Sequence, residues 1–70
     1  MHMANEQQQL GNRIATLRRT VGLPQRVLAE AANCSQPRIS SIEQGKLVPN
    51  TKELRGIERV LGVLPRSLDK

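Results

Sequence analysis

A short segment of the chain concentrates side chains that form directional hydrogen bonds. Its polar residues are Gln36, Arg38, Ser40, Ser41 and Gln44. Ile39 and Ile42 alternate with them at helical spacing, so a helix through this segment turns the isoleucines inward and the polar groups outward. Amide, hydroxyl and guanidinium groups on one exposed face suit the edges of base pairs and the phosphates of a duplex. The segment therefore indicates a surface that binds double-stranded DNA.

A helix that carries such a surface needs a second helix to hold it. In the run 25–44, Ala29 stands where two helices would press closely, and Asn33 stands at the turn between them. A side chain larger than a methyl group at Ala29 would separate the helices, and asparagine tolerates the left-handed backbone of a tight turn. The inward-facing set consists of Leu28, Ala32, Cys34, Ile39 and Ile42. This spacing predicts a helix-turn-helix.

The composition fits one small helical domain with a basic surface. The chain has 70 residues and no Phe, Tyr or Trp, so its core must be aliphatic. An aliphatic core favours short helices packed closely and counts against modules that stack bases on aromatic rings. The net charge of +5 favours a polyanionic partner, although composition alone is equally consistent with a merely solvated basic surface.

The residue inventory argues against catalysis and metal binding. One Cys and one His provide neither an internal disulfide nor a ligand cluster, and the sequence has no nucleophile with a base, no paired carboxylates and no glycine-rich phosphate loop. We therefore expect no enzyme activity, cofactor, metal or small-molecule ligand. Because no apolar run is long enough for a membrane span and no signal-peptide pattern is present, we expect a cytoplasmic protein.

The apolar spacing predicts an all-α fold, a compact domain of four to five helices. Leu10, Ile14, Leu17 and Val21 form the stripe of a first helix that starts at Glu6 or Gln7 and ends before Gly22. Further helices are expected at 25–32, 36–44 and 51–61, followed by a turn or the stub of a fifth helix. We expect residues 1–5 to be a disordered extension, whose Met1-His2-Met3 looks like a remnant of cloning, and residues 6–70 to form the helix-turn-helix domain.

Capping residues mark the ends of these helices. Ser35 precedes the third helix as its cap, and Pro37 falls in its first turn, where a missing N–H is harmless. Asn50 and Glu53 have the spacing of a capping box at the start of the fourth helix. Pro24 precedes the second helix but offers no side-chain cap, and Gly56 is expected to weaken the fourth helix.

With these residues in place, the chain resembles the lambdoid phage repressor and Cro family, also called the xenobiotic-response-element family of bacterial regulators. The resemblance covers about Leu10 to Leu68. It rests on four motifs in order: Gly-Leu-x-Gln, Leu-Ala-Glu, Ser-Gln-x-x-Ile-Ser and Ile-Glu-x-Gly. It implies a bacterial or phage DNA-binding domain of five helices, similar to lambda repressor, that acts as a dimer and lays its third helix in the major groove.

The resemblance also implies roles for particular residues. Its base-reading positions correspond to Ser35, Gln36, Pro37 and Ser41, with Arg38 beside them. Gln36 is the strongest of these, because a glutamine early in a groove helix can bond N6 and N7 of adenine together. The phosphate-binding positions correspond to Gln25, Gln44 and Lys46, and Arg38 on the flank suits phosphate better than guanine. Arg18 and Glu43 correspond to a structural ion pair between the first and third helices.

Other residues depart from the family or carry weaker signals. Glu58 stands where a small apolar residue is usual, so it either turns to solvent or meets a basic residue of a partner subunit. Cys34 belongs to the apolar set and is expected to be an inert thiol. The remaining basic residues are expected to be solvated: Arg13, Arg19, Arg26, Lys52, Arg55, Arg59 and Arg66.

The sequence predicts a transcriptional regulator, a repressor that binds a palindromic operator as a homodimer. The expected dimer interface is Val60, Val63, Leu64 and Leu68. Two alternatives of the same class are a controller of a restriction-modification system and the antitoxin of a toxin pair. An alternative of another class is an adaptor that has lost DNA binding and docks a protein on the same apolar patch. Whether the chain is part of a longer regulator stays open.

Overall fold

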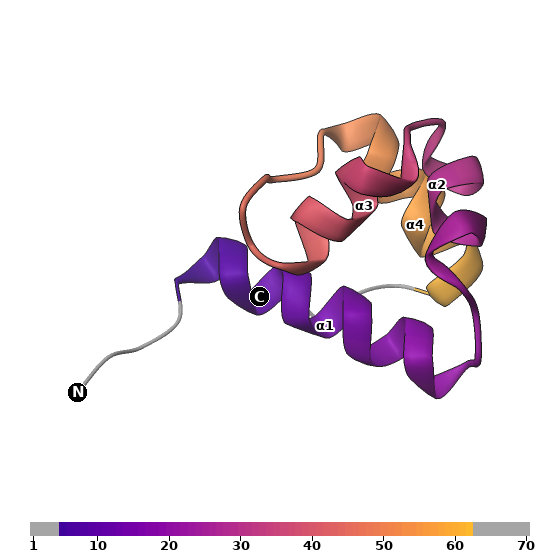
Figure 1. Ribbon diagram of the computed structural model, residues 1–70, viewed down its shortest axis with the longest axis horizontal. Helices are drawn as coiled ribbons and strands as arrows, with labels where there is room; N and C mark the ends of the chain where they lie inside the picture. The colour runs from indigo at the N-terminus through magenta and orange to yellow at the C-terminus, as the bar shows by residue number, and fades with distance from the viewer. Residues whose placement is uncertain (1–4, 63–70) are drawn as a thin grey trace.

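The computed structural model describes residues 5–62, which fold into four α-helices without a strand. The helices are α1 (Glu6–Thr20), α2 (Gln25–Ala32), α3 (Gln36–Glu43) and α4 (Thr51–Leu61). In Figure 1, α1 lies along one side of the domain, α3 and α4 pack against it, and α2 packs on α3 and α4. None of these helices has the length and apolar character that crossing a bilayer requires. The fold is therefore the all-α helix-turn-helix domain that the spacing predicts, and the expected stub after residue 62 lies outside the described residues.

The capping residues act at the helix ends where the sequence places them. Ser35 Oγ accepts a hydrogen bond from the Arg38 N–H, and the side chains of Asn50 and Glu53 form the capping box of α4. The turn between α2 and α3 has Asn33 in the left-handed conformation, with φ 57° and ψ 48°. Asn5 differs from its prediction as part of a disordered extension, because it caps α1 in a second capping box.

The core is formed by five fully buried side chains from all four helices: Ile14, Leu28, Ile39, Ile42 and Ile57. Val21, expected in the apolar stripe of the first helix, is 51% exposed instead. The reason is that α1 ends at Thr20 and the chain turns at Gly22, with φ 76°, which directs Leu23 rather than Val21 onto the core. Hydrophobic spacing alone extends the first helix one residue too far.

Glycine and alanine allow the helices to approach closely around α3 and α4. A Cβ atom at Gly56 would overlap the carbonyl oxygen of Ala31, and a Cβ atom at Gly11 would overlap that of Ile42. Ala29, expected where α2 and α3 press together, is buried. Glycine has a low helix propensity, but Gly56 is also what lets α4 pack directly on the backbone of α2.

The Gly56→Ala variant should therefore unfold more easily despite its higher helix propensity. We expect a loss of about 1–3 kcal/mol in the free energy of unfolding, because the added methyl group forces α2 and α4 apart. Urea denaturation followed by circular dichroism measures this loss. Lys52→Ala, at an exposed position of the same helix, is the matched control and should change stability by under about 0.5 kcal/mol. Equal or higher stability of Gly56→Ala would contradict the packing argument.

Candidate nucleic-acid interface

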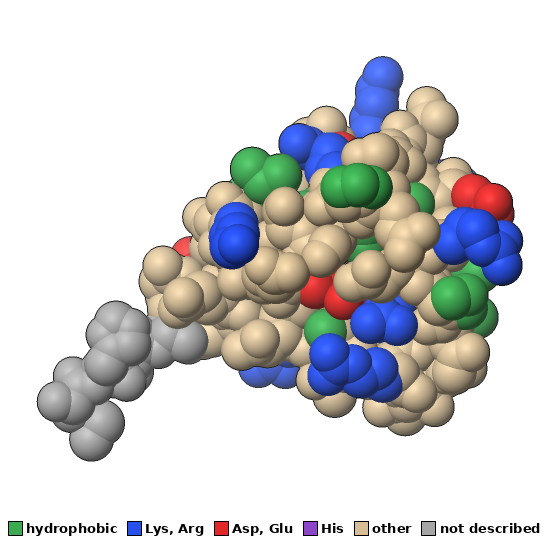
Figure 2. Space-filling model, in the orientation of Figure 1, with side chains coloured by type: hydrophobic (Ala, Val, Ile, Leu, Met, Phe, Trp, Pro, Cys, Tyr) green, Lys and Arg blue, Asp and Glu red, His purple; other side chains and the backbone are tan. Residues whose placement is uncertain are grey.

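One face of α3 is left open to solvent by the rest of the described chain. Gln36, Pro37 and Gln44 are exposed, and Ser40 and Ser41 are partly exposed. The opposite side of the helix is closed, since Ile39 and Ile42 are fully buried. On the face that Figure 2 draws, hydrophobic side chains occur only as separate small areas, and Lys and Arg side chains are distributed around it. The open face of α3 can therefore meet another molecule through amide and hydroxyl groups.

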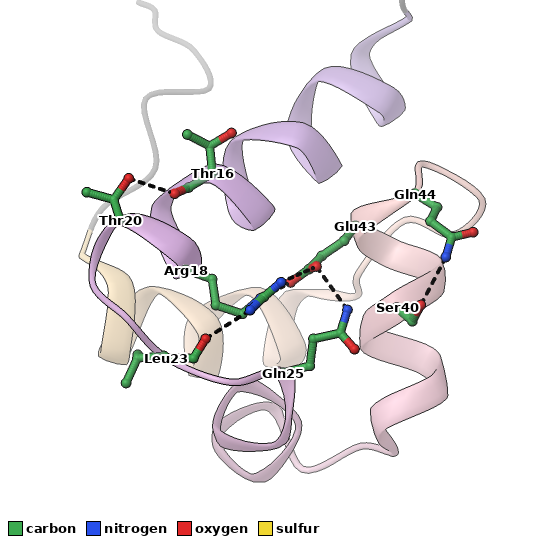
Figure 3. Close-up of polar contacts among 8 residues, drawn as sticks. All are labelled: Thr16, Arg18, Thr20, Leu23, Gln25, Ser40, Glu43 and Gln44. Atoms are coloured by element: carbon green, nitrogen blue, oxygen red, sulfur yellow. Dashed lines mark hydrogen bonds and ion pairs between the residues drawn. The ribbon is translucent and has the colours of Figure 1, made fainter.

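A buried carboxylate fixes the C-terminal end of α3. The Glu43 side chain is 5% exposed and receives Arg18 Nε at 2.7 Å on one oxygen, with Arg18 Nη2 at 3.2 Å and Gln25 Nε2 at 3.0 Å on the other. Figure 3 shows Arg18 from α1, Gln25 from α2 and Glu43 from α3 pointing toward one another. The structure thus brings Arg18 and Glu43 together as the predicted ion pair. Arg18 also donates to the Leu23 carbonyl at 2.9 Å, which ties in the turn between α1 and α2.

Gln25 is oriented by this network at the first turn of α2. Its amide nitrogen donates to Glu43, so its amide oxygen stays available as an acceptor. Pro24, the N-cap, forms no side-chain hydrogen bond, which is the loss of a cap that the sequence predicts. The uncapped first turn leaves backbone N–H donors next to Gln25. Together these groups give the start of α2 the polarity that an anion requires.

Arg38 takes a different position from the other predicted contact residues. Its Nη2 donates to Glu53 Oε1 at 3.1 Å and its Nε to Glu53 Oε2, so the guanidinium lies against the start of α4. With 3.6 residues per helical turn, Arg38 falls outside the arc that Gln36, Ser40 and Gln44 share. The structure therefore does not bring Arg38 onto the open face. The position of Arg38 on the helix already indicates that it lies away from the open face. Its pairing with Glu53 depends on how α4 packs, and the sequence alone does not predict it.

The buried side chain of Glu53 both pairs with Arg38 and caps α4. Its carboxylate accepts from Arg38 and from the Asn50 N–H, while the Asn50 side chain accepts from the Glu53 N–H. The hydrogen bond from Arg38 holds the pKa of Glu53 below its ordinary value, and the bond from Asn50 acts in the same direction against the effect of burial. The ionised form of Glu53 is thus the form that fastens α3 to α4.

The other predicted residues occupy simpler positions. Ser35 is exposed at the N-cap of α3, and Lys46 is exposed just after the helix. The side chain of Gln44 donates to Ser40 Oγ at 3.0 Å, which aligns these two groups along the open face. Of the expected dimer residues, Val60 is at the surface of α4, whereas Val63, Leu64 and Leu68 lie outside the described residues.

Cys34 and the acidic residues give no second site in the described part of the chain. Cys34 is only partly buried, less than its place in the apolar set suggests, and burial raises the pKa of its thiol. A raised pKa keeps the thiol protonated and poorly nucleophilic. Within residues 5–62, no three His, Cys, Asp or Glu side chains gather as a metal site. Glu58 is partly exposed and interacts within the structure.

A comparison with protein families agrees with this geometry. A family model described as a helix-turn-helix domain matches residues 9–69, a range that contains α2, the turn at Asn33 and α3. No curated protein matches the chain.

The pairing of Glu53 predicts a dependence of stability on pH. Because the pKa of Glu53 is lower in the folded state, its stabilising effect is complete above its ordinary value of 4.5 and is lost as the pH falls through the folded-state pKa. Urea denaturation should show Glu53→Gln less stable than the wild type at pH 7, with the difference narrowing at pH 3. Glu30→Gln, whose side chain is 69% exposed, is the control and should lose little at either pH. A difference for Glu53→Gln that stays constant with pH would argue against this role.

Proposed function

We propose that this chain, which belongs to the helix-turn-helix domain family, is a transcriptional regulator that binds specific sequences of double-stranded DNA. The observation that carries the proposal is the open face of α3, which is polar, uncovered within residues 5–62, and held at both ends by buried carboxylates. An α-helix of this kind fits the major groove, where each base pair presents a distinct pattern of donors and acceptors. This family membership supports DNA binding and the resemblance to lambdoid repressors supports the finer details below.

Base reading is assigned to the start and middle of α3. Gln36 is exposed at the first residue of the helix and is our candidate for bonding an adenine through N6 and N7. Ser41 and the capping Ser35 supply hydroxyl groups, and the Pro37 ring suits a thymine methyl group. Because the helix is short, we expect direct readout of only a few base pairs in each half-site.

Phosphate binding is assigned to groups around this face. Gln25 stands at the uncapped start of α2, Gln44 at the end of α3 and Lys46 in the following loop. Arg38 lies on the side of α3 that faces α4, and its pairing with Glu53 positions α3. We therefore assign Arg38 only a secondary contact to phosphate. The excess of basic residues in the chain raises affinity for any duplex and makes binding sensitive to salt.

We further propose a homodimer in which Val60 and the apolar residues after α4 form the interface. A two-fold axis would then place the two copies of α3 about 34 Å apart, one turn of the duplex, on a palindromic operator. Occupying such an operator blocks transcription without further chemistry, so we propose a repressor of the lambdoid type that acts in the cytoplasm as a binding protein and not as an enzyme.

Selection of bound sequences from a random duplex pool tests the proposal directly. We expect a symmetric site with half-sites one helical turn apart.

Gln36→Ala should lose about 1–3 kcal/mol of binding free energy and relax the preference at one base pair of each half-site. Lys46→Ala should weaken all sequences alike and lower the salt dependence, because it removes a phosphate contact. If the wild type selects no preferred sequence, the proposed sequence-specific binding is wrong. If Gln36→Ala keeps the same preference, the base-reading role of Gln36 is wrong.

A further inference from the structure

A polar cleft lies beside the open face of α3. Its volume is about 230 Å³, and α1 forms one wall with Asn12, Thr16 and Arg19. The opposite wall comes from Ser40 of α3 and from Gln44, the C-cap of that helix, which belong to the open face itself. This cleft could not be predicted from the sequence, because its residues come from helices that meet only in the folded domain.

The charges around the cleft leave one cation without a partner. Glu43 also lines the cleft, but both of its oxygens accept hydrogen bonds from Arg18 or Gln25, so the Arg18 guanidinium balances its charge. Arg19 is exposed at the cleft and forms no ion pair with any residue from 5 to 62. The cleft therefore combines one uncompensated positive charge with neutral amide and hydroxyl groups.

We propose that this cleft holds a backbone phosphate of the bound duplex and that Arg19 is its principal contact, an inference that rests on the proposed function. When α3 enters the major groove, the strand that borders the groove passes beside the helix. Ser40 and Gln44 would then guide this strand toward the cleft, where Arg19 meets a phosphate. A guanidinium offers two parallel N–H donors to phosphate oxygens, and amide and hydroxyl groups can complete the contact.

This assignment gives α1 a direct role in binding. In the sequence, Arg19 is one of several basic residues expected to be solvated, and nothing in the chain's pattern separates it from Arg13. The fold separates them, because Arg13 lies on the same helix but does not line the cleft. The two arginines are therefore a matched pair for an experiment.

The first test measures duplex affinity as a function of salt for the full chain, using the operator selected by the wild type. The logarithm of the binding constant falls with the logarithm of the salt concentration, and removing one phosphate contact makes this slope about 0.9 less steep. That change corresponds to a loss of about five-fold in affinity near 0.15 M salt. We expect this change for Arg19→Gln and a clearly smaller one for Arg13→Gln. Thermal unfolding of both variants should match the wild type, since each side chain is exposed.

The second test locates the phosphate. Duplexes in which single phosphates are replaced by uncharged methylphosphonates are bound to the wild type and to Arg19→Gln in a double-mutant cycle. We expect one position in each half-site, on the strand bordering the groove, where the replacement weakens the wild type but has little effect on the variant. Equal slopes for wild type and Arg19→Gln, or no position that depends on Arg19, would overturn the inference and leave the proposed function intact. Absence of wild-type DNA binding would overturn both.

Discussion

The buried carboxylate of Glu43 is the constraint on which the geometry of the open face depends. A charge removed from water is tolerated only with a close opposite charge and satisfied hydrogen bonds, and removing one partner of such a pair costs about 3–5 kcal/mol. Glu43 obtains these from Arg18 of α1 and Gln25 of α2, so three helices must meet at the last residue of α3. Any rotation of α3 about its axis would separate the carboxylate from both partners, which fixes the residues that face outward.

The second charged residue of α3 serves the same purpose near the other end. Arg38 binds Glu53, and Glu53 also caps α4, so the position of α4 is set by the same group that holds α3. Since both charged side chains of α3 are paired with other helices, the open face itself carries only neutral amides, hydroxyls and a proline ring. In the binding mode that we propose, neutral groups of α3 would distinguish base pairs, and cations on neighbouring segments, Lys46 and Arg19, would supply the attraction to phosphate.

Local signals made much of the fold predictable, whereas contacts between helices did not follow from them. The bounds of α2, the left-handed Asn33 and the caps at Ser35 and Asn50 depend on short-range stereochemistry, which the residue types express directly. The close approach at Gly56 depends on where another helix lies, and Val21 is exposed because the chain turns at Gly22 and directs Leu23 onto the core. For the site, the pattern predicted the outward face and the family resemblance implied the Arg18–Glu43 pair. The Arg38–Glu53 pair and the cleft at Arg19 arise from side chains that only the tertiary packing brings together.

Everything proposed for this chain requires that it docks on DNA with the outward face of α3. Amide chemical shifts of the isotope-labelled protein, recorded by NMR during titration with a duplex containing its selected operator, test this most directly. We expect the largest changes in the first turn of α2 and at Gln36, Ser40, Ser41 and Gln44, with little change at the far side of the domain around Arg59. Changes concentrated in α4, or the absence of any change at the α3 face on saturation, would contradict it.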